Sequence, residues 1–106
     1  MRTLRIIPRD SFDLYAALVR KEIGLARKKQ GTFYRSGRKK HGEAKWAHEA
    51  YSGWVSLQRC KDGVVIAEIQ TRARPSREWE LLHPFLGFLE RHFGNRINAI
   101  NILFLG

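Results

Sequence analysis

The sequence predicts one α+β domain, a two-layer sandwich in which an antiparallel-rich sheet carries two helices on one face. Two stretches repeat apolar residues at three- and four-residue steps, as amphipathic helices do. Between them, shorter runs alternate apolar and polar residues and are separated by glycine-containing turns, as antiparallel strands are. With 106 residues the chain can form one core but not two ordinary ones, so residues 1–106 are expected to be a single compact domain.

The first part of the chain predicts a strand followed by a long helix. Residues 3–8 form the strand, which ends at a proline. The helix is expected to have Asp10 or Ser11 as its N-cap and to stop at Gly31. Its buried stripe is expected to contain Phe12, Tyr15, Val19, Ile23 and Ala26, widened by Leu14, Leu18 and Leu25.

A short strand over residues 32–35 and then an antiparallel meander are expected next. Alternate residues of a strand face opposite sides of the sheet. Trp46 is therefore expected on the other face from Lys45, and Val55 on the other face from Trp54. The strands of the meander and their turns are expected at residues 45–50, Ser52-Gly53, residues 54–60, Lys61-Asp62-Gly63 and residues 64–72.

The end of the chain predicts a second helix and a last strand. Ser76 is the expected N-cap and Gly94 the expected end, while Pro84 is expected to kink or restart the helix. Residues 97–105 are a continuous apolar run, typical of a strand that is buried on both faces or used at an interface. The inward stripe of the helix is expected to contain Trp79, Leu82, Leu86, Leu89 and Phe93.

The element order is therefore β-α-(β)-β-β-β-α-β. Without residues 32–50 this order reduces to βαββαβ, the ferredoxin-like plan, with those residues as an insertion. The other topology is a single antiparallel sheet with two helices packed on one face. Both leave one face of the sheet without helices.

Positive charge is concentrated in one part of the chain. The formal net charge is +10, from 20 Lys and Arg against 10 Asp and Glu. Residues 20–45 contain ten basic and two acidic residues, which is +8 of that total. Basic residues 27–29 lie where a helix C-terminus is expected and are explained by the helix dipole. Arg38, Lys39 and Lys40 have no such structural role, so a polyanion-binding surface is expected there.

These observations favour a small, non-enzymatic protein that binds single-stranded or irregular RNA or DNA. Aromatic rings standing among cations on a sheet can stack unpaired bases while the cations hold phosphates. The expected stacking surfaces are those of Tyr34, Trp46 or Trp54. The expected basic contacts are Arg35, Arg38, Lys39, Lys40, Lys45 and Arg59.

Two alternatives remain open from the sequence. One is a protein-interaction or homo-oligomerising module that uses the aromatic sheet face and the C-terminal strand, with a second copy or an acidic protein as partner. The other is a metal-free ribonuclease in which His41 and His48 exchange protons with the 2′-hydroxyl and the leaving oxygen.

Other classes of function find no support in the residues. The four histidines and Cys60 match no metal-ligand spacing, and no Gly-rich phosphate loop is present, so no metal and no cofactor are expected. The start of the chain has no signal-peptide core and no apolar run is long enough for a membrane span. A cytoplasmic protein is therefore expected.

Overall fold

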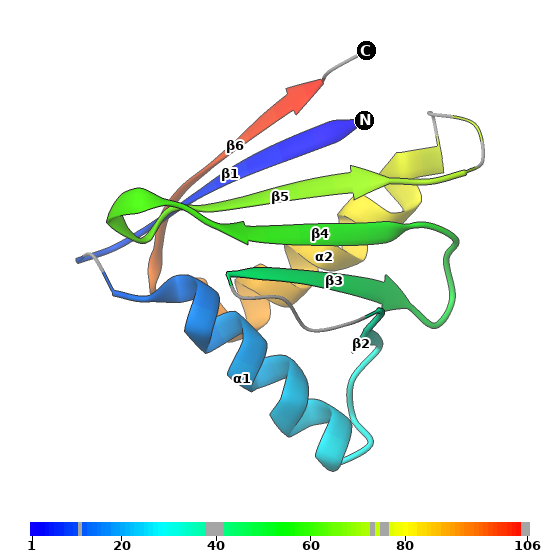
Figure 1. The fold of residues 1–106 in the computed structure, drawn as a ribbon, viewed down its shortest axis with the longest axis horizontal. Helices are drawn as coiled ribbons and strands as arrows, with labels where there is room; N and C mark the ends of the chain where they lie inside the picture. The colour runs from blue at the N-terminus through cyan, green and yellow to red at the C-terminus, as the bar shows by residue number, and fades with distance from the viewer. Residues whose placement is uncertain (11, 38–41, 73, 75–76, 105–106) are drawn as a thin grey trace.

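The computed structural model describes residues 1–10, 12–37, 42–72, 74 and 77–104. It consists of one six-stranded sheet and two α-helices (Figure 1). The elements in chain order are β1 (Arg2–Pro8), α1 (Leu14–Arg27), β2 (Phe33–Arg35), β3 (Glu43–His48), β4 (Trp54–Arg59), the 3-10 turn η1 (Lys61–Gly63), β5 (Val65–Gln70), α2 (Glu78–Phe93) and β6 (Ile97–Phe104). Neither helix, within these ranges, is long and apolar enough to cross a membrane.

The strand order is β2-β3-β4-β5-β1-β6, and every neighbouring pair is antiparallel. The predicted α+β sandwich and its element order are confirmed. Strands β1 and β4 are both antiparallel to β5, which lies between them, so β1, α1 and β4 form a split βαβ unit with the β2–β3 hairpin inserted between α1 and β4. β5, α2 and β6 form a second unit of this kind, in which β1 lies between β5 and β6. The β2–β3 hairpin extends the sheet beside β4.

One face of the sheet is buried beneath the helices and the other is open. In Figure 1 the strands lie in front of α2, so the open face is turned toward the viewer. The alternation expected from the sequence is confirmed on β1, β4 and β5, where alternate residues are buried, with the exceptions of exposed Arg59 and buried Thr3. The fully buried residues on these strands include Leu4, Ile6, Val55, Val65, Ala67 and Ile69.

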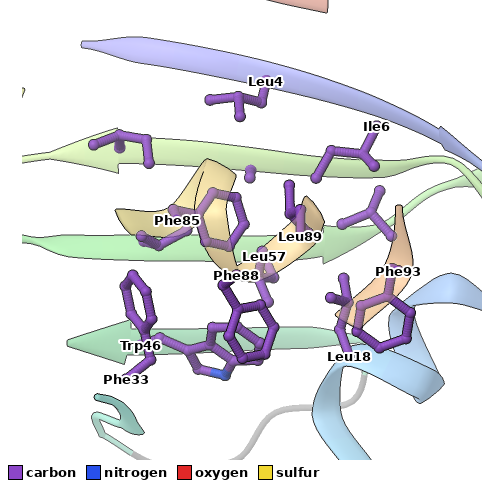
Figure 2. Packing of buried hydrophobic residues seen from close by; sticks show 14 of the residues in the cluster. Leu4, Ile6, Leu18, Phe33, Trp46, Leu57, Phe85, Phe88, Leu89 and Phe93 are labelled. Atoms are coloured by element: carbon purple, nitrogen blue, oxygen red, sulfur yellow. The ribbon is translucent and has the colours of Figure 1, made fainter. Parts of the chain in front are cut away.

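Four aromatic rings form the part of the core beneath the β2–β3 hairpin (Figure 2). Trp46 is only 1% exposed, and its ring centroid lies 5.4 Å from that of Phe88 and 6.3 Å from that of Phe85. Phe33 packs edge-on against both phenylalanine rings at 6.0 Å. These contacts join the hairpin to α2, although the two segments are far apart in the chain.

Helix α1 begins later than the sequence analysis predicted. Its N-cap is Asp13, whose Oδ1 accepts a hydrogen bond from the amide of Ala16 at 3.1 Å. Asp10 lies before the helix with a φ of 56°, so it is not the cap, and Ser11 lies outside the described residues. At the other end of the helix, the residue with a positive φ is Lys29. The predicted terminator, Gly31, lies two residues further along the chain.

The inward face of α2 also differs from the prediction. Trp79 is 49% exposed and Leu86 is only partly buried. The buried residues of α2 are Glu78, Leu81, Leu82, Phe85, Phe88, Leu89 and Phe93. The helix runs without interruption through Pro84, so it does not restart there, and Ser76 lies outside the described residues. The physical reason is that α2 is apolar around much of its circumference, and packing against Trp46 and Phe33 selects the side that is buried.

Strand β6 lies at the edge of the sheet and is not buried on both faces as its apolar run suggested. Its pairing partner is β1, and Leu103 and Phe104 are 48% and 69% exposed. The guanidinium of Arg2 lies 5.2 Å from the centre of the Phe104 ring. Ile97 is buried and Ile100 and Ile102 pack partly against the core, but the end of the strand at Leu103 and Phe104 is exposed.

Candidate functional site

The open face of the sheet presents three rows of side chains near the β2–β3 hairpin. Residues paired across antiparallel strands lie side by side on the same face, so the strand register sets the rows. Continuing the β3–β4 pairing by one residue beyond Trp46 and Val55 places Ala47 beside Trp54. The rows, each running across neighbouring strands, are Tyr34, Ala47 and Trp54, then Lys45, Ser56 and Glu68, then Glu43, Gln58 and Ile66.

The first row carries two aromatic rings separated by a small residue. Tyr34 is 50% exposed and Trp54 is partly buried. The Lys45 ammonium lies 4.6 Å from the centre of the Trp54 ring, a cation–π contact. Ala47, which lies between the two rings in this row, has only a methyl side chain.

A cavity of about 410 Å³ lies over the second and third rows. Small residues explain it, because Ser56 leaves room between the longer side chains on either side of it, and Ser36 and Gly37 approach from the loop after β2. Its volume is within the range of small-molecule pockets in proteins. The polar side chains that line it are Ser36, Glu43, Lys45, Ser56, Gln58 and Glu68.

The charges around the cavity are of both signs. Among the described residues, neither Glu43 nor Glu68 forms an ion pair. Oε2 of Glu68 accepts a hydrogen bond from Nε2 of Gln70 at 3.4 Å, which is long for such a bond. Glu68 and Lys45 therefore flank the cavity on opposite sides of Ser56, with the Lys45 ammonium resting against the Trp54 ring.

Three of the predicted site residues are brought together and three are not. Tyr34, Lys45 and Trp54 share the open face. Trp46 is fully buried in the core, so its prediction as a stacking residue is wrong. Arg35 is paired with Trp46 and therefore faces the helix side, where its backbone amide donates a hydrogen bond to Oε1 of Glu22 at 2.7 Å.

Arg59 also belongs to the opposite side of the sheet. Its guanidinium forms an ion pair with Asp13 at 3.0 Å and lies 4.9 Å from the centre of the Tyr15 ring. It thus holds the start of α1 against β4 and does not join the open face, contrary to the prediction. The remaining predicted contacts, Arg38, Lys39 and Lys40, lie outside the described residues.

The sequence analysis missed two parts of this region. Glu22 is 6% exposed, yet its position within an otherwise charged stretch suggested a surface residue. The cavity was also missed, because Ser56, Gln58 and Glu68 read as ordinary solvent-facing strand residues. The signal that could have found the cavity is the small Ser56 between Lys45 and Glu68, but it appears only when three strands are aligned.

His48 lies on the helix side of β3, away from the open face. Its side chain is buried, its Nδ1 accepts a hydrogen bond from the amide of Ala50 at 3.0 Å, and its ring packs edge-on against Phe33. Burial lowers the pKa of His48 below its usual 6.5, and Glu49 only partly opposes this. His41 lies outside the described residues. A histidine enclosed in this way is placed for packing and not for proton transfer to a ligand on the open face.

The lowered pKa of His48 predicts a loss of stability in acid. Burial also lowers the pKa of His92, and the positive charges of Lys21 and Arg91 lower it further. Below about pH 6.5 the unfolded chain binds more protons at both sites than the folded chain, so the free energy of unfolding falls as the pH falls further. We expect the melting temperature to drop as the pH is lowered from about 7.5 to about 5.5. In His48→Asn, the Oδ1 of asparagine can replace Nδ1 as hydrogen-bond acceptor but does not titrate, so this variant should show a smaller drop. His83→Gln on exposed α2 surface is the control, and an equal reduction in both variants would contradict the assignment.

Comparison with protein-family models, with curated proteins and with solved structures found no match. Among the described residues, no group of three or more His, Cys, Asp or Glu side chains is arranged to hold a metal ion. Inferences about function therefore rest on the geometry of the open face and on the distribution of charge.

Proposed function

We propose that this protein binds single-stranded nucleic acid on the open face of its sheet. The observation that carries the proposal is the gathering of Tyr34, Trp54 and Lys45 beside a cavity of about 410 Å³, on the one face that no helix covers. Aromatic rings on an exposed sheet stack unpaired bases, whereas a duplex hides its base faces. The ligand is therefore expected to be a single strand.

The charge distribution supports the same ligand. The basic window of residues 20–45 includes β2 and the start of β3, which form one end of the sheet, and of its described cations Lys45 lies on the open face, while the others lie on α1, just after it, or on the helix side of β2. The described part of the face is itself mixed in charge, with Glu43 and Glu68 beside Lys45. Phosphates are therefore expected to contact the cations that follow β2 in the sequence, Arg38, Lys39 and Lys40, and bases are expected over the rings and the cavity.

Binding is expected to replace the Lys45 ammonium on the Trp54 ring by a base. In the free protein the Lys45 ammonium lies against the Trp54 ring. A base that stacks on Trp54 would displace the ammonium, which could then contact the bound strand. Stacking of one base is worth about 1–3 kcal/mol, against about 0.5–1 kcal/mol for an exposed cation–π contact, so the exchange favours the bound state.

Binding should be sensitive to salt and to the loop cations. If about six cations contact phosphates, the slope of log affinity against log salt is about −4 for a single strand. Replacing Arg38, Lys39 and Lys40 by glutamine is expected to weaken binding and to flatten the slope by about 2 units. The measurement is a fluorescence titration of a labelled RNA or DNA single strand at several salt concentrations.

A matched triple variant provides the control for this experiment. Glutamine at Arg27, Lys28 and Lys29 removes the same charge from the end of α1, where basic residues are explained by the helix dipole. We expect a smaller loss of affinity from this variant. Equal losses in the two triple variants, or binding that heparin matches at physiological salt, would show that only net charge matters and would contradict recognition by the open face.

The exposed edge of the sheet favours a second candidate function, assembly with another protein or a second copy. β6 contains no charged residue, and Leu103 and Phe104 are 48% and 69% exposed. Edge strands of this kind can pair with another strand. Sedimentation of the protein alone and with an RNA single strand distinguishes the two, because assembly through β6 needs no nucleic acid.

A further inference from the structure

We infer that the cavity on the open face takes one unpaired guanine base, held between Glu68 and Lys45. This inference rests on the proposed function and adds the base that the site prefers. The cavity lies beside the aromatic row, so a strand stacked on Trp54 or Tyr34 would bring its next base over Ser56.

The geometry begins with the middle row of the open face. Lys45 pairs with Ser56, and Ser56 pairs with Glu68, so the cation and the carboxylate stand on either side of a small residue. Neighbouring strands are about 4.8 Å apart, which separates the Cα atoms of Lys45 and Glu68 by about 10 Å. A purine lying over Ser56 fits between two side chains at that separation.

The chemistry of the two flanking groups selects guanine. A carboxylate has two acceptor oxygens and binds most strongly to two parallel N–H donors. The Watson–Crick edge of guanine offers such a pair, N1–H and N2–H, while its O6 and N7 are adjacent acceptors suited to a lysine ammonium. Adenine and cytosine present one amino group to the carboxylate, and uracil presents one ring N–H. Guanine alone among them uses both groups fully.

The other side chains of the cavity are compatible with this arrangement. Gln58, on the same strand as Ser56, can donate to or accept from a base edge. Glu68 is free of any ion pair with the described residues and accepts only a long hydrogen bond from Gln70, so binding would not first have to break a strong interaction. Ile66 provides an apolar part of the lining against which a base can rest.

The test measures how affinity depends on one central base. Seven-nucleotide strands of uridine with guanosine, inosine, adenosine, cytidine or uridine at the centre are titrated by tryptophan fluorescence at about 150 mM salt. We expect guanosine to bind about tenfold more tightly than uridine. Inosine lacks only the N2 amino group and is expected to lose most of that gain. The same series with deoxyribose, and guanosine monophosphate alone, separate recognition of the base from recognition of the sugar or of a free nucleotide.

Two variants assign the preference to the cavity. Glu68→Gln leaves one acceptor oxygen, so the preference for guanosine over uridine should disappear. Glu90→Gln removes the same charge from an exposed position of α2 and should leave the preference unchanged. Ser56→Leu fills the space between Lys45 and Glu68 with a residue that a strand tolerates, and it too should abolish the preference.

The outcomes separate this inference from the proposed function. Equal affinity of the wild type for all five strands would overturn the guanine site and leave single-strand binding intact. A guanosine preference that survives Glu68→Gln and Ser56→Leu, in variants with unchanged circular dichroism, would also overturn it. Absence of binding to every strand would overturn the proposed function and this inference together.

Discussion

Replacing Trp46 by alanine is expected to lower the free energy of unfolding by about 3–5 kcal/mol. The indole is 1% exposed and contacts Phe33, Phe85 and Phe88, so its removal leaves a cavity among rigid rings that cannot easily close over it. The contacts also join the β2–β3 hairpin to α2, and their loss should loosen the hairpin that carries Tyr34 and Lys45. Affinity for nucleic acid should therefore fall together with stability.

The measurement is urea denaturation followed by circular dichroism, and Trp79→Ala is the control. Trp79 is 49% exposed on α2, so removing it should cost less than about 1 kcal/mol. A similar loss in the two variants would mean that Trp46 is not the centre of the core. Trp79→Ala should also leave nucleic-acid binding unchanged, because Trp79 lies on the helix side of the sheet.

Replacing Gly53 by alanine is expected to be the second most destabilising change, by more than about 2 kcal/mol. Gly53 is the last residue of the connection between β3 and β4 and has a φ of +105°, a conformation that residues with a Cβ rarely adopt. A Cβ there would also meet the backbone oxygen of Gln70 at well below contact distance. The backbone of β5 would have to move, and that strand carries Glu68 in the cavity.

Gly24→Ala is the matched control, with an effect of opposite sign. Gly24 lies inside α1, and a Cβ at this position has no atom within 4 Å. Alanine favours a helix over glycine by about 1 kcal/mol, so this variant should be more stable than the wild type. Thermal unfolding of both variants gives the comparison, and destabilisation by Gly24→Ala or tolerance of Gly53→Ala would contradict the described backbone.

The sequence predicted the strands more accurately than the helix faces. Alternation with period two identified Val55 and Leu57 as opposite to Trp54, because a strand has only two faces and one of them must be apolar. The turn at Asp62-Gly63, with φ values of 62° and 78°, was predicted for the same local reason. By contrast, α2 has apolar residues around much of its surface, so its period did not show that Trp79 is exposed.

The candidate site was only partly predictable, and the two tryptophans show why. Trp46 and Trp54 both lie in alternating runs, and nothing local indicates which face the helices cover. The structure pairs Trp46 with Val55, which places Trp46 in the core and Trp54 on the open face. Arg59 was misplaced for the same reason, since it shares the helix side with Asp13 and Tyr15.

By itself, the sequence determined the kind and order of the elements, the alternation within each strand and the concentration of positive charge. These properties depend on residues close together in the chain, where dihedral preferences, turn chemistry and side-chain period act directly. Only the tertiary structure decided the strand order, and with it the cavity between Lys45, Ser56 and Glu68 and the exposed edge at β6. Those features join residues on different strands, and their positions follow from how the helices and the sheet bury the most apolar surface together.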